Sequence, residues 1–271
     1  MEIKVGFIGT GNMGTALIKS IVKSGALPAQ NLYIYDVDKS KLAALAEETG
    51  TIAAASATQL VQTSDVVILA VKPNIVKTAL ESCKTEFTGQ KLLVSIAVGI
   101  PIKFYKDIIG QDKKVVRVMP NTPALVGEGM SLISYGKEVT ESDAENVRML
   151  LECAGKVEYL EEKLMSEVTA LTGSSPAYVF MFIEAMADAA VLSGIPRNLA
   201  YRLAAQAVLG SAKMVLDTGK HPGELKDQVC SPAGTTIEAV SSLEKNGFRY
   251  AVMEAMNECT KKAREFGKIY G

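Results

Sequence analysis

The chain has 271 residues, of which 48% are hydrophobic, 22% charged and 6% aromatic, and its net charge at neutral pH is −1. That length allows two domains with substantial cores, and the balanced charge gives no electrostatic footprint for nucleic acid. No apolar run reaches the ~20 residues that a membrane span needs, and the chain does not start with the pattern of a signal peptide. We therefore expect a cytoplasmic protein with neither a nucleic-acid nor a membrane partner.

The cysteines are widely scattered and form no C-x-x-C pair, which argues against a zinc site or a disulfide framework. We interpret them as reduced, mostly buried thiols of a cytoplasmic protein, and we expect no metal. They are Cys83, Cys153, Cys230 and Cys259.

The first elements surround a glycine-rich loop. Residues 3–8 predict a short buried strand, and residues 16–22 predict a helix that ends at Gly25. Between them lies a G-x-G-x-x-G pattern, which is typical of a dinucleotide-binding turn when strand, loop and helix follow in this order. The first glycine allows the tight turn, the second lets a pyrophosphate approach the backbone, and the third lets the helix pack on the strand. The loop residues are Gly9, Thr10, Gly11, Asn12, Met13 and Gly14.

A second strand is predicted over residues 31–35, and it ends at Asp36. An acid in this place holds the adenine ribose of a bound dinucleotide through its 2′-hydroxyl group and repels a 2′-phosphate. This favours NADH, although residues 39–41 supply two lysines and a serine that could reach a phosphate. We therefore expect both NADH and NADPH to be used. The alternative to dinucleotide binding is that residues 9–14 form a glycine-rich turn in some other strand–helix unit.

The pattern of strand and helix continues to about residue 160. The run at 65–71 is almost entirely apolar, as expected for a parallel strand buried on both faces. This alternation predicts an α/β, Rossmann-like, doubly wound sheet. Further strands are predicted over 51–54, 91–97, 114–119, 130–135 and 156–160, and helices over 39–48, after Ser56, from Pro101 to Gly110 and over 142–153.

From residue 163 onward no strand is predicted, so we divide the chain into a dinucleotide-binding domain, 1–162, and an all-α domain, 163–271. The run at 178–192 is apolar on every side apart from Glu184 and Asp188, which indicates a subunit interface. The alternative is the central helix of a monomeric bundle. Helices are expected over 163–171, 176–193, 197–218, 222–230, 235–246 and 248–266.

Ligands of open α/β sheets bind beyond the carboxyl ends of the strands. The nicotinamide is therefore expected near residues 70–73 and 119–121, although Lys72 could be a solvated lysine and Pro73 could merely shape a turn. The candidate residues at this edge, besides Asp36, are Ala70, Val71, Lys72, Pro73, Ala97 and Asn121.

Residues 230–236 join two predicted helices with small residues and hydroxyl groups. Thr235 or Thr236 could cap the second helix. The same place could instead bind a substrate carboxylate, because the backbone N–H groups and the dipole of a helix start favour an anion. Residues 172–176 form a second loop of this kind.

A strong general acid is hard to find in the second half. The one histidine of the sequence, His221, precedes Pro222 in a predicted turn and is interpreted as structural, and no lysine occurs over residues 164–211. Reduction of a carbonyl requires such an acid because an alkoxide must be protonated. Reduction of a protonated imine does not, so positioning and one hydroxyl group near the nitrogen can suffice.

Four segments resemble the pyrroline-5-carboxylate reductase family over essentially the whole chain. They are Phe7-Ile8-Gly9-Thr10-Gly11-Asn12-Met13, Ala70-Val71-Lys72-Pro73, the run from Arg117 to Pro123, and most specifically the run from Leu225 to Thr236. The resemblance implies reduction of 1-pyrroline-5-carboxylate to L-proline with NADPH or NADH, and a homodimer formed through the helical domains, possibly within a larger ring.

The resemblance also implies the roles of individual residues. Gly234, Thr235 and Thr236 would hold the carboxylate and ring nitrogen of the substrate, with Ser231 nearby and Thr236 as the catalytic hydroxyl. Glu162 matches an acidic position near the substrate. Two alternatives stay open: another imine or 2-hydroxyacid reductase on the same scaffold, and a non-catalytic protein that senses NAD(P).

Overall fold

The computed structural model describes residues 3–270 and divides into two compact units. The first unit contains residues 3–173 and 260–270, and the second contains residues 174–259. The division lies eleven residues beyond the boundary predicted from sequence, and the end of the chain returns to the first unit.

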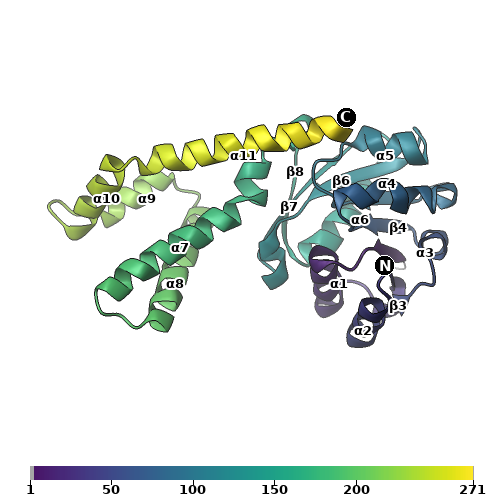
Figure 1. Cartoon of the computed structure of the whole chain (residues 1–271), viewed down its shortest axis with the longest axis horizontal. Helices are drawn as coiled ribbons and strands as arrows, with labels where there is room; N and C mark the ends of the chain where they lie inside the picture. Colours follow the sequence, from purple (N-terminus) through teal and green to yellow (C-terminus); the bar gives the residue numbers. More distant parts are fainter. Residues whose placement is uncertain (1–2, 271) are drawn as a thin grey trace. The chain divides into compact units, whose positions relative to one another are not determined.

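The first unit contains an eight-stranded sheet of order β3-β2-β1-β4-β5-β6-β7-β8. Figure 1 shows this sheet with helices packed around it. The first six strands are parallel to one another, β7 is antiparallel to β6, and β8 is parallel to β7. This confirms the predicted doubly wound sheet and adds a reversal at β7. The strands are β1 (Val5–Ile8), β2 (Leu32–Tyr35), β3 (Ile52–Ala53), β4 (Val66–Leu69), β5 (Leu92–Ser95), β6 (Lys114–Met119), β7 (Gly129–Tyr135) and β8 (Gly155–Tyr159).

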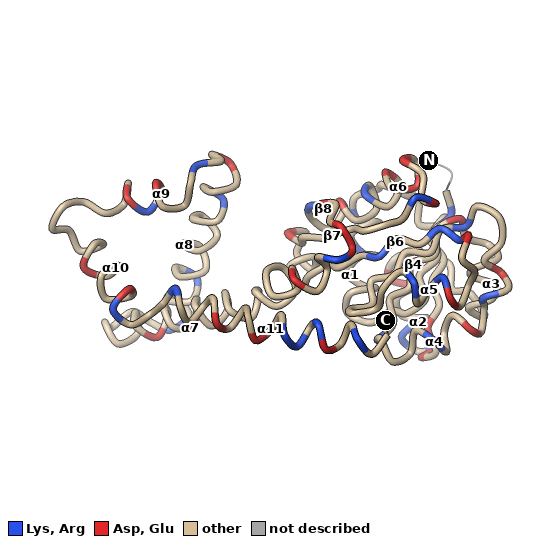
Figure 2. The backbone as a smooth tube through the Cα atoms, turned by 90° about the horizontal axis from the view of Figure 1, so that it is seen from above, with Lys and Arg blue, Asp and Glu red and all other residues tan. Residues whose placement is uncertain are grey.

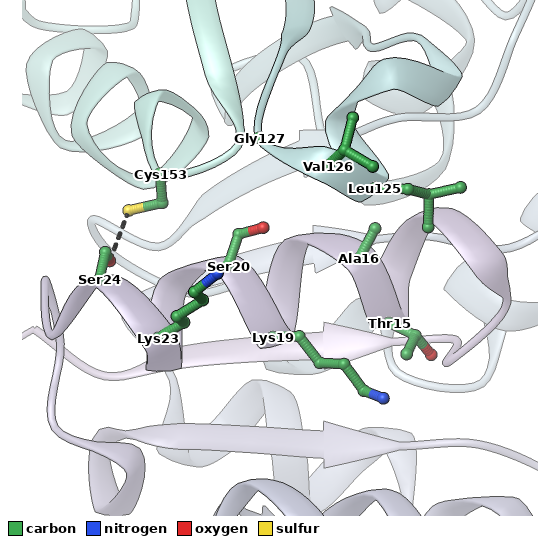
Figure 3. A pocket seen from close by; sticks show the side chains of 10 residues that line it. All are labelled: Thr15, Ala16, Lys19, Ser20, Lys23, Ser24, Leu125, Val126, Gly127 and Cys153. Atoms are coloured by element: carbon green, nitrogen blue, oxygen red, sulfur yellow. Dashed lines mark hydrogen bonds between the residues drawn. The ribbon is translucent and has the colours of Figure 1, made fainter. Parts of the chain in front are cut away.

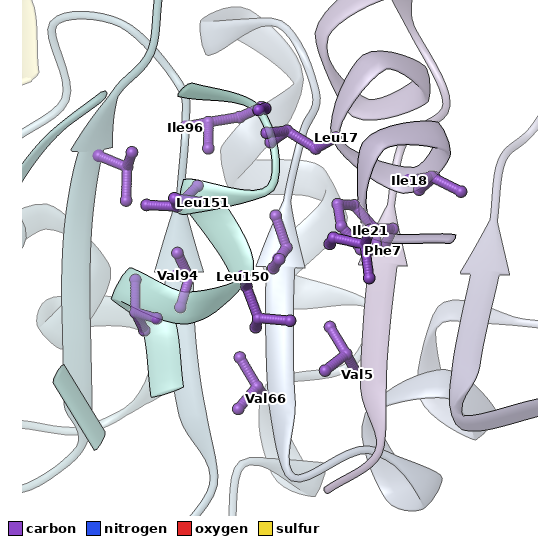
Figure 4. Close-up of a cluster of buried hydrophobic side chains, with 14 of the residues drawn as sticks. Val5, Phe7, Leu17, Ile18, Ile21, Val66, Val94, Ile96, Leu150 and Leu151 are labelled. Atoms are coloured by element: carbon purple, nitrogen blue, oxygen red, sulfur yellow. The ribbon is translucent and has the colours of Figure 1, made fainter. Parts of the chain in front are cut away.

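Helices cover both faces of this sheet. On one face α1, α2 and α6 bury Phe7, Val94 and their neighbours in one apolar cluster (Figure 4). On the other face α3, α4 and α5 enclose a second cluster that includes Val67 and the fully buried Tyr105. The helices are α1 (Asn12–Ser24), α2 (Lys39–Thr49), α3 (Ala57–Thr63), α4 (Pro73–Glu81), α5 (Ile102–Ile109) and α6 (Glu141–Glu152).

The second unit is helical, as predicted. Its first two helices pack through small residues, because Ala187 of α7 and Ala200 and Ala204 of α8 are buried. The elements are α7 (Ser175–Leu192), α8 (Arg197–Thr218), α9 (Pro222–Val229), α10 (Thr235–Lys245) and α11 (Phe248–Tyr270), the last of which continues into the first unit. Figure 2 shows that positive and negative residues are interspersed along α11.

Three sequence-based expectations were wrong in detail. The helix expected over 163–171 is a 3-10 turn at Glu162–Leu164 followed by a π-helical turn at Thr169–Gly173.

Helix α4 was missed, although a proline at its first position is a common helix start. Of the four cysteines only Cys83 is buried, and burial raises the pKa of its thiol to about 11.

Helix α7 exposes most of its apolar surface in the single chain. The side chains of Phe180 and Met181 are 63% and 69% exposed. The apolar run is longer than expected from sequence: the 24-residue helical stretch Thr169–Leu192 contains an 18-residue window with a mean hydropathy of 1.4 and is long and apolar enough to cross a membrane. Length and composition alone are weak evidence for a span, since an apolar helix of a soluble protein passes the same test.

Candidate dinucleotide and substrate sites

The glycine-rich loop connects β1 to α1 in a conformation that two of its glycines make necessary. Gly9 has φ +100°, and a Cβ atom placed on it would lie 2.6 Å from the carbonyl oxygen of Ala70. A Cβ atom on Gly14 would lie 2.6 Å from the carbonyl oxygen of Gly9. Gly9 therefore allows the loop to pack against Ala70 just beyond β4, and Gly14 lets the start of α1 lie close to Gly9.

Gly11 differs from the other two glycines because its surroundings are open. It precedes α1 as the N-cap residue, with φ −67° and ψ −178°, and no side chain caps the helix. A Cβ atom on Gly11 would meet nothing within 4 Å. The space beside Gly11 and the free N–H groups of the first helical turn suit a bound phosphate. The loop therefore fits a dinucleotide.

Asp36 follows β2 directly, and its carboxylate is fixed by hydrogen bonds. Oδ2 accepts the backbone N–H of Thr10 at 2.7 Å and the Thr10 hydroxyl at 2.9 Å, and Oδ1 accepts the N–H of Asp38 at 3.0 Å. Partial burial acts to raise the pKa of Asp36, but these hydrogen bonds outweigh burial and lower the pKa below its usual value. Asp36 is therefore a fixed negative charge at neutral pH.

A cavity of about 270 Å³ lies beyond the ends of β1 and β2, with Asp36 in its wall. It joins three residues that the sequence had singled out, Gly9, Asp36 and Val71, to residues of α3 and α4 that the sequence reasoning missed. The apolar positions of α4, spaced by four residues after Pro73, were the signal that could have found them. The lining residues are Ile8, Gly9, Tyr35, Asp36, Val37, Ala57, Val71, Ile75, Thr78, Ala79 and Ser82.

Two candidates expected near the nicotinamide have structural contacts. Ala97 is buried, and its N–H donates to the hydroxyl of Ser95 at 3.3 Å. Asn121 donates from Nδ2 to the carbonyl oxygen of Thr172 at 3.0 Å and accepts the N–H of Met130 on Oδ1 at 2.8 Å. The Asn121 side chain thus joins the loop after β6 to β7 and to the π-helical turn.

Glu162 anchors the start of α5. Its Oε1 atom accepts the backbone N–H of Ile102 at 2.6 Å and lies 3.3 Å from the guanidinium of Arg117. Arg117 is buried in β6, with its side chain 10% exposed, and Glu162 neutralises its charge. Glu162 was expected from sequence to lie near the substrate, and its ion pair with Arg117 was not expected.

In the second unit, the candidate loop lies between α9 and α10. The N-cap of α10 is Gly234, and no side chain caps the helix, so Thr235 and Thr236 occupy its first two positions without acting as caps. Within residues 3–270, neither threonine hydroxyl has a hydrogen-bond partner. The loop therefore presents free backbone N–H groups and free hydroxyl groups together.

This loop contains a strained residue. Ala233 has φ +55°, the only positive φ of a non-glycine residue in the part of the chain that the structure describes. Ala233→Gly is expected to raise the free energy of unfolding by about 1 kcal/mol, because a left-handed conformation costs an L-residue roughly that much. Chemical denaturation measures the change. Ala239→Gly, an exposed change inside α10, is the control and should lower the free energy of unfolding by about 1 kcal/mol; destabilisation by both changes would contradict the strain.

His221 has a structural role, as the sequence analysis interpreted it. Its Nδ1 atom accepts the N–H of Gly223 at 3.0 Å, which caps the start of α9. This satisfies one of the N–H groups that a helix start leaves free.

The first unit also contains a cavity of about 610 Å³ along the outer side of α1, where the side chains of Lys19 and Lys23 extend (Figure 3). Lys19 forms an ion pair with Glu48 at 2.6 Å. Of the candidate site residues, none lines this cavity, so its size does not locate the site. The lining residues are Thr15, Ala16, Lys19, Ser20, Lys23, Ser24, Leu125, Val126, Gly127 and Cys153.

Two protein families match this chain, one over the dinucleotide-binding half and one over the helical half. The family described as "NADP oxidoreductase coenzyme F420-dependent" matches residues 4–99, and "Pyrroline-5-carboxylate reductase dimerisation" matches residues 162–266. The pyrroline-5-carboxylate reductase of Escherichia coli (strain K12) is 48% identical over 268 residues, which cover 99% of this chain and 100% of the relative.

Two solved structures are similar over nearly the whole chain. A pyrroline-5-carboxylate reductase from Coxiella burnetii has a TM-score of 0.93 at 29% identity, covering 98% of this chain and 99% of that one. The Plasmodium falciparum pyrroline carboxylate reductase, with NADP bound, has a TM-score of 0.89 at 36% identity and the same coverage.

A Rossmann-like sheet with a dinucleotide loop, followed by a helical unit, defines the chain as an oxidoreductase that uses a nicotinamide dinucleotide. The 48% sequence identity to the Escherichia coli pyrroline-5-carboxylate reductase, over that relative's full length, identifies the family within this class. The chain belongs to the pyrroline-5-carboxylate reductase family.

Proposed function

We propose that this chain reduces 1-pyrroline-5-carboxylate to L-proline, the last step of proline biosynthesis, using NADH or NADPH. The loop of residues 230–236 carries the proposal, because it offers free N–H groups and hydroxyl groups in a chain 48% identical to a named reductase. The alternatives, another imine or 2-hydroxyacid reductase or a non-catalytic sensor, find no support among these relatives.

In this proposal the first unit holds the dinucleotide. The open space at Gly11 and the start of α1 receive the pyrophosphate, and Asp36 faces the adenine ribose. The residues of the loop and of the sheet edge complete the site, with Ala97 and Asn121 toward the nicotinamide. The nicotinamide supplies the hydride. The full set proposed is Gly9, Thr10, Gly11, Asn12, Met13, Gly14, Asp36, Ala70, Val71, Lys72, Pro73, Ala97 and Asn121.

The second unit holds the substrate. The N–H groups at the start of α10, together with Gly234, bind the carboxylate, and Ser231 and Thr235 border it. The hydroxyl of Thr236 orients the ring nitrogen. Because the imine enters protonated, hydride addition at its carbon moves the C=N π electrons to nitrogen and leaves a neutral amine, so no residue must donate a proton in that step. Glu162 belongs to the first unit, where it fixes the start of α5; its place near the substrate is what the family resemblance implies.

The activity is tested by following dinucleotide oxidation with and without 1-pyrroline-5-carboxylate, for NADH and NADPH separately, and by identifying the product chromatographically. Oxidation that depends on the imine and yields L-proline is expected. Oxidation driven by a 2-keto acid but not by the imine would support the hydroxyacid alternative instead.

We also propose that two copies of the chain form a homodimer through the helical half, with dimers able to join in a larger ring, in the cytoplasm. The match to a dimerisation family and the exposure of α7 support the dimer. The start of that match at residue 162 supports a domain boundary near this residue.

Met181→Asp is expected to raise the dissociation constant of the dimer by at least about 30-fold, because a charge would replace an apolar side chain inside an interface. Light scattering across a dilution series measures this. Val126→Asp is the matched control, since Val126 is 78% exposed in the first unit and should leave the dimer intact. A wild-type chain that is monomeric at micromolar concentration would refute the dimer.

A further inference from the structure

Thr10 carries an interaction that the phosphate turn does not require. It lies between Gly9 and Gly11, where a dinucleotide loop accepts many residue types, and it is 4% exposed. Both its N–H and its hydroxyl donate to the same oxygen of Asp36, at 2.7 and 2.9 Å. The hydroxyl bond therefore depends on the identity of residue 10, whereas the N–H bond does not.

These bonds determine how the Asp36 carboxylate is presented to the cavity. Oδ2 is held by two donors from Thr10, and Oδ1 accepts one donor, the N–H of Asp38. A carboxylate oxygen can accept two hydrogen bonds, so Oδ1 keeps capacity for a hydroxyl group of a ribose. A 2′-phosphate has no hydroxyl to donate there and meets a fixed negative charge instead.

Most of the groups at the end of β2 that could otherwise receive a phosphate already have contacts within the chain. The N–H and hydroxyl of Ser40 and the N–H of Lys41 all donate to Oδ1 of Asp38, at 3.1, 2.7 and 3.1 Å, so a carboxylate caps the start of α2. Lys39 places its Nζ atom over the ring of Tyr35, 4.4 Å from the centroid. Asp36 and Asp38 thus oppose an incoming phosphate at a helix start where the N–H groups of Ser40 and Lys41 and the Ser40 hydroxyl are already bonded to Asp38.

We propose that Thr10 is a positioning residue that sets the cofactor preference: it locks the Asp36 carboxylate toward the ribose, so that this chain binds NADH more tightly than NADPH. The proposal rests on the dinucleotide occupying the glycine-rich loop, as proposed above. The proposed preference for NADH is a property of this chain and not of every relative, because the Plasmodium falciparum relative has NADP bound.

The test is to measure the binding of NADH and of NADPH to the assembled protein without substrate. Calorimetry or the fluorescence of the reduced nicotinamide gives the dissociation constant for each. The wild type should bind NADH about 10-fold or more tightly than NADPH. Thr10→Val, which keeps the shape and the N–H but removes the hydroxyl, should lower this ratio on the order of 10-fold, as expected for a lost hydrogen bond to a charged group. Thr10→Ser, which keeps the hydroxyl, should preserve the ratio.

A double-mutant cycle isolates the coupling. Asp36→Ala should abolish the preference, and Thr10→Val should then have no further effect on the ratio. Thr10→Ala replaces Thr10→Val if melting shows that the latter is unfolded. General damage to the loop would weaken both dinucleotides equally, so the ratio reports the positioning role and not the stability of the turn.

The outcomes separate this proposal from the proposed reaction. Equal or tighter binding of NADPH by the wild type, or an unchanged ratio in Thr10→Val, overturns the role of Thr10. Binding of neither dinucleotide overturns both proposals. A preference for NADH that follows Thr10, in a protein that fails to reduce 1-pyrroline-5-carboxylate, supports the role of Thr10 and overturns the proposed reaction.

Discussion

Thr236→Ala is expected to lower kcat/KM for 1-pyrroline-5-carboxylate by about 30- to 1,000-fold, while the melting temperature and the affinity for the dinucleotide stay unchanged. The loss of one positioned hydrogen bond at a reacting centre costs about 2–4 kcal/mol, and each 1.36 kcal/mol corresponds to a tenfold change in rate. The proposed hydroxyl–nitrogen contact is the only one of this kind that the mechanism assigns to a side chain.

Steady-state kinetics and thermal denaturation on the same preparation test this expectation. Thr236→Ser keeps the hydroxyl and should retain most of the activity, whereas Thr236→Val keeps the shape and should behave like the alanine variant. Thr235→Val is the neighbouring control and should have the smaller effect, because Thr235 is assigned to the border of the carboxylate site.

The competing interpretation makes Thr236 a helix cap. It predicts a loss of roughly 1 kcal/mol of stability with little change in turnover. The structure argues against it, since Gly234 is the N-cap residue of α10 and no side-chain cap is formed. Wild-type kinetics together with a lowered melting temperature would nevertheless establish a structural role alone.

Local patterns in the sequence were sufficient to predict most of the first unit. The strand, the glycine-rich loop, the following helix and Asp36 are contiguous or nearly so, and the apolar run at 65–71 indicates a strand buried on both faces. The reversal at β7 was not predicted, because strand direction depends on how the short connection Thr122–Val126 turns the chain and not on the composition of the strand.

The contacts within the site could not be predicted in the same way. The bonds from Thr10 to Asp36 and from Ile102 to Glu162 join residues far apart in sequence, and they depend on the register of the sheet and on side-chain rotamers. The sequence analysis identified residue types suited to a ligand, but it could not show that Asn121 and Glu162 hold the scaffold. The roles of the site residues toward ligands remain predictions.

The partner of helix α7 could not be predicted from sequence either. Its composition predicted burial on every side, yet within one chain only Ala187 of this helix is buried. A pattern of apolar residues reports that a surface avoids water, and it does not distinguish a neighbouring helix from a second copy of the chain.

Gly11→Ala is expected to weaken the binding of both NADH and NADPH by about 100-fold while leaving the fold unchanged. Its backbone conformation, φ −67° and ψ −178°, is open to alanine, and a Cβ atom there meets nothing within 4 Å, so folding should not be strained. The added methyl group would instead occupy the space through which the pyrophosphate approaches the backbone. The loss of a backbone hydrogen bond to a charged phosphate costs about 1.5–3 kcal/mol, which corresponds to a rise in Kd of up to about 100-fold.

Calorimetric titration with each dinucleotide, together with thermal denaturation, measures the two parts of this prediction. Gly9→Ala is the contrasting variant: with φ +100° and only 2.6 Å between the new Cβ atom and the Ala70 carbonyl oxygen, it should lower the melting temperature as well as binding. Because Gly9 serves the turn and Gly11 serves the ligand, only Gly11→Ala should separate binding from stability. Near-normal dinucleotide affinity in a folded Gly11→Ala protein would show that the phosphates do not pass this residue.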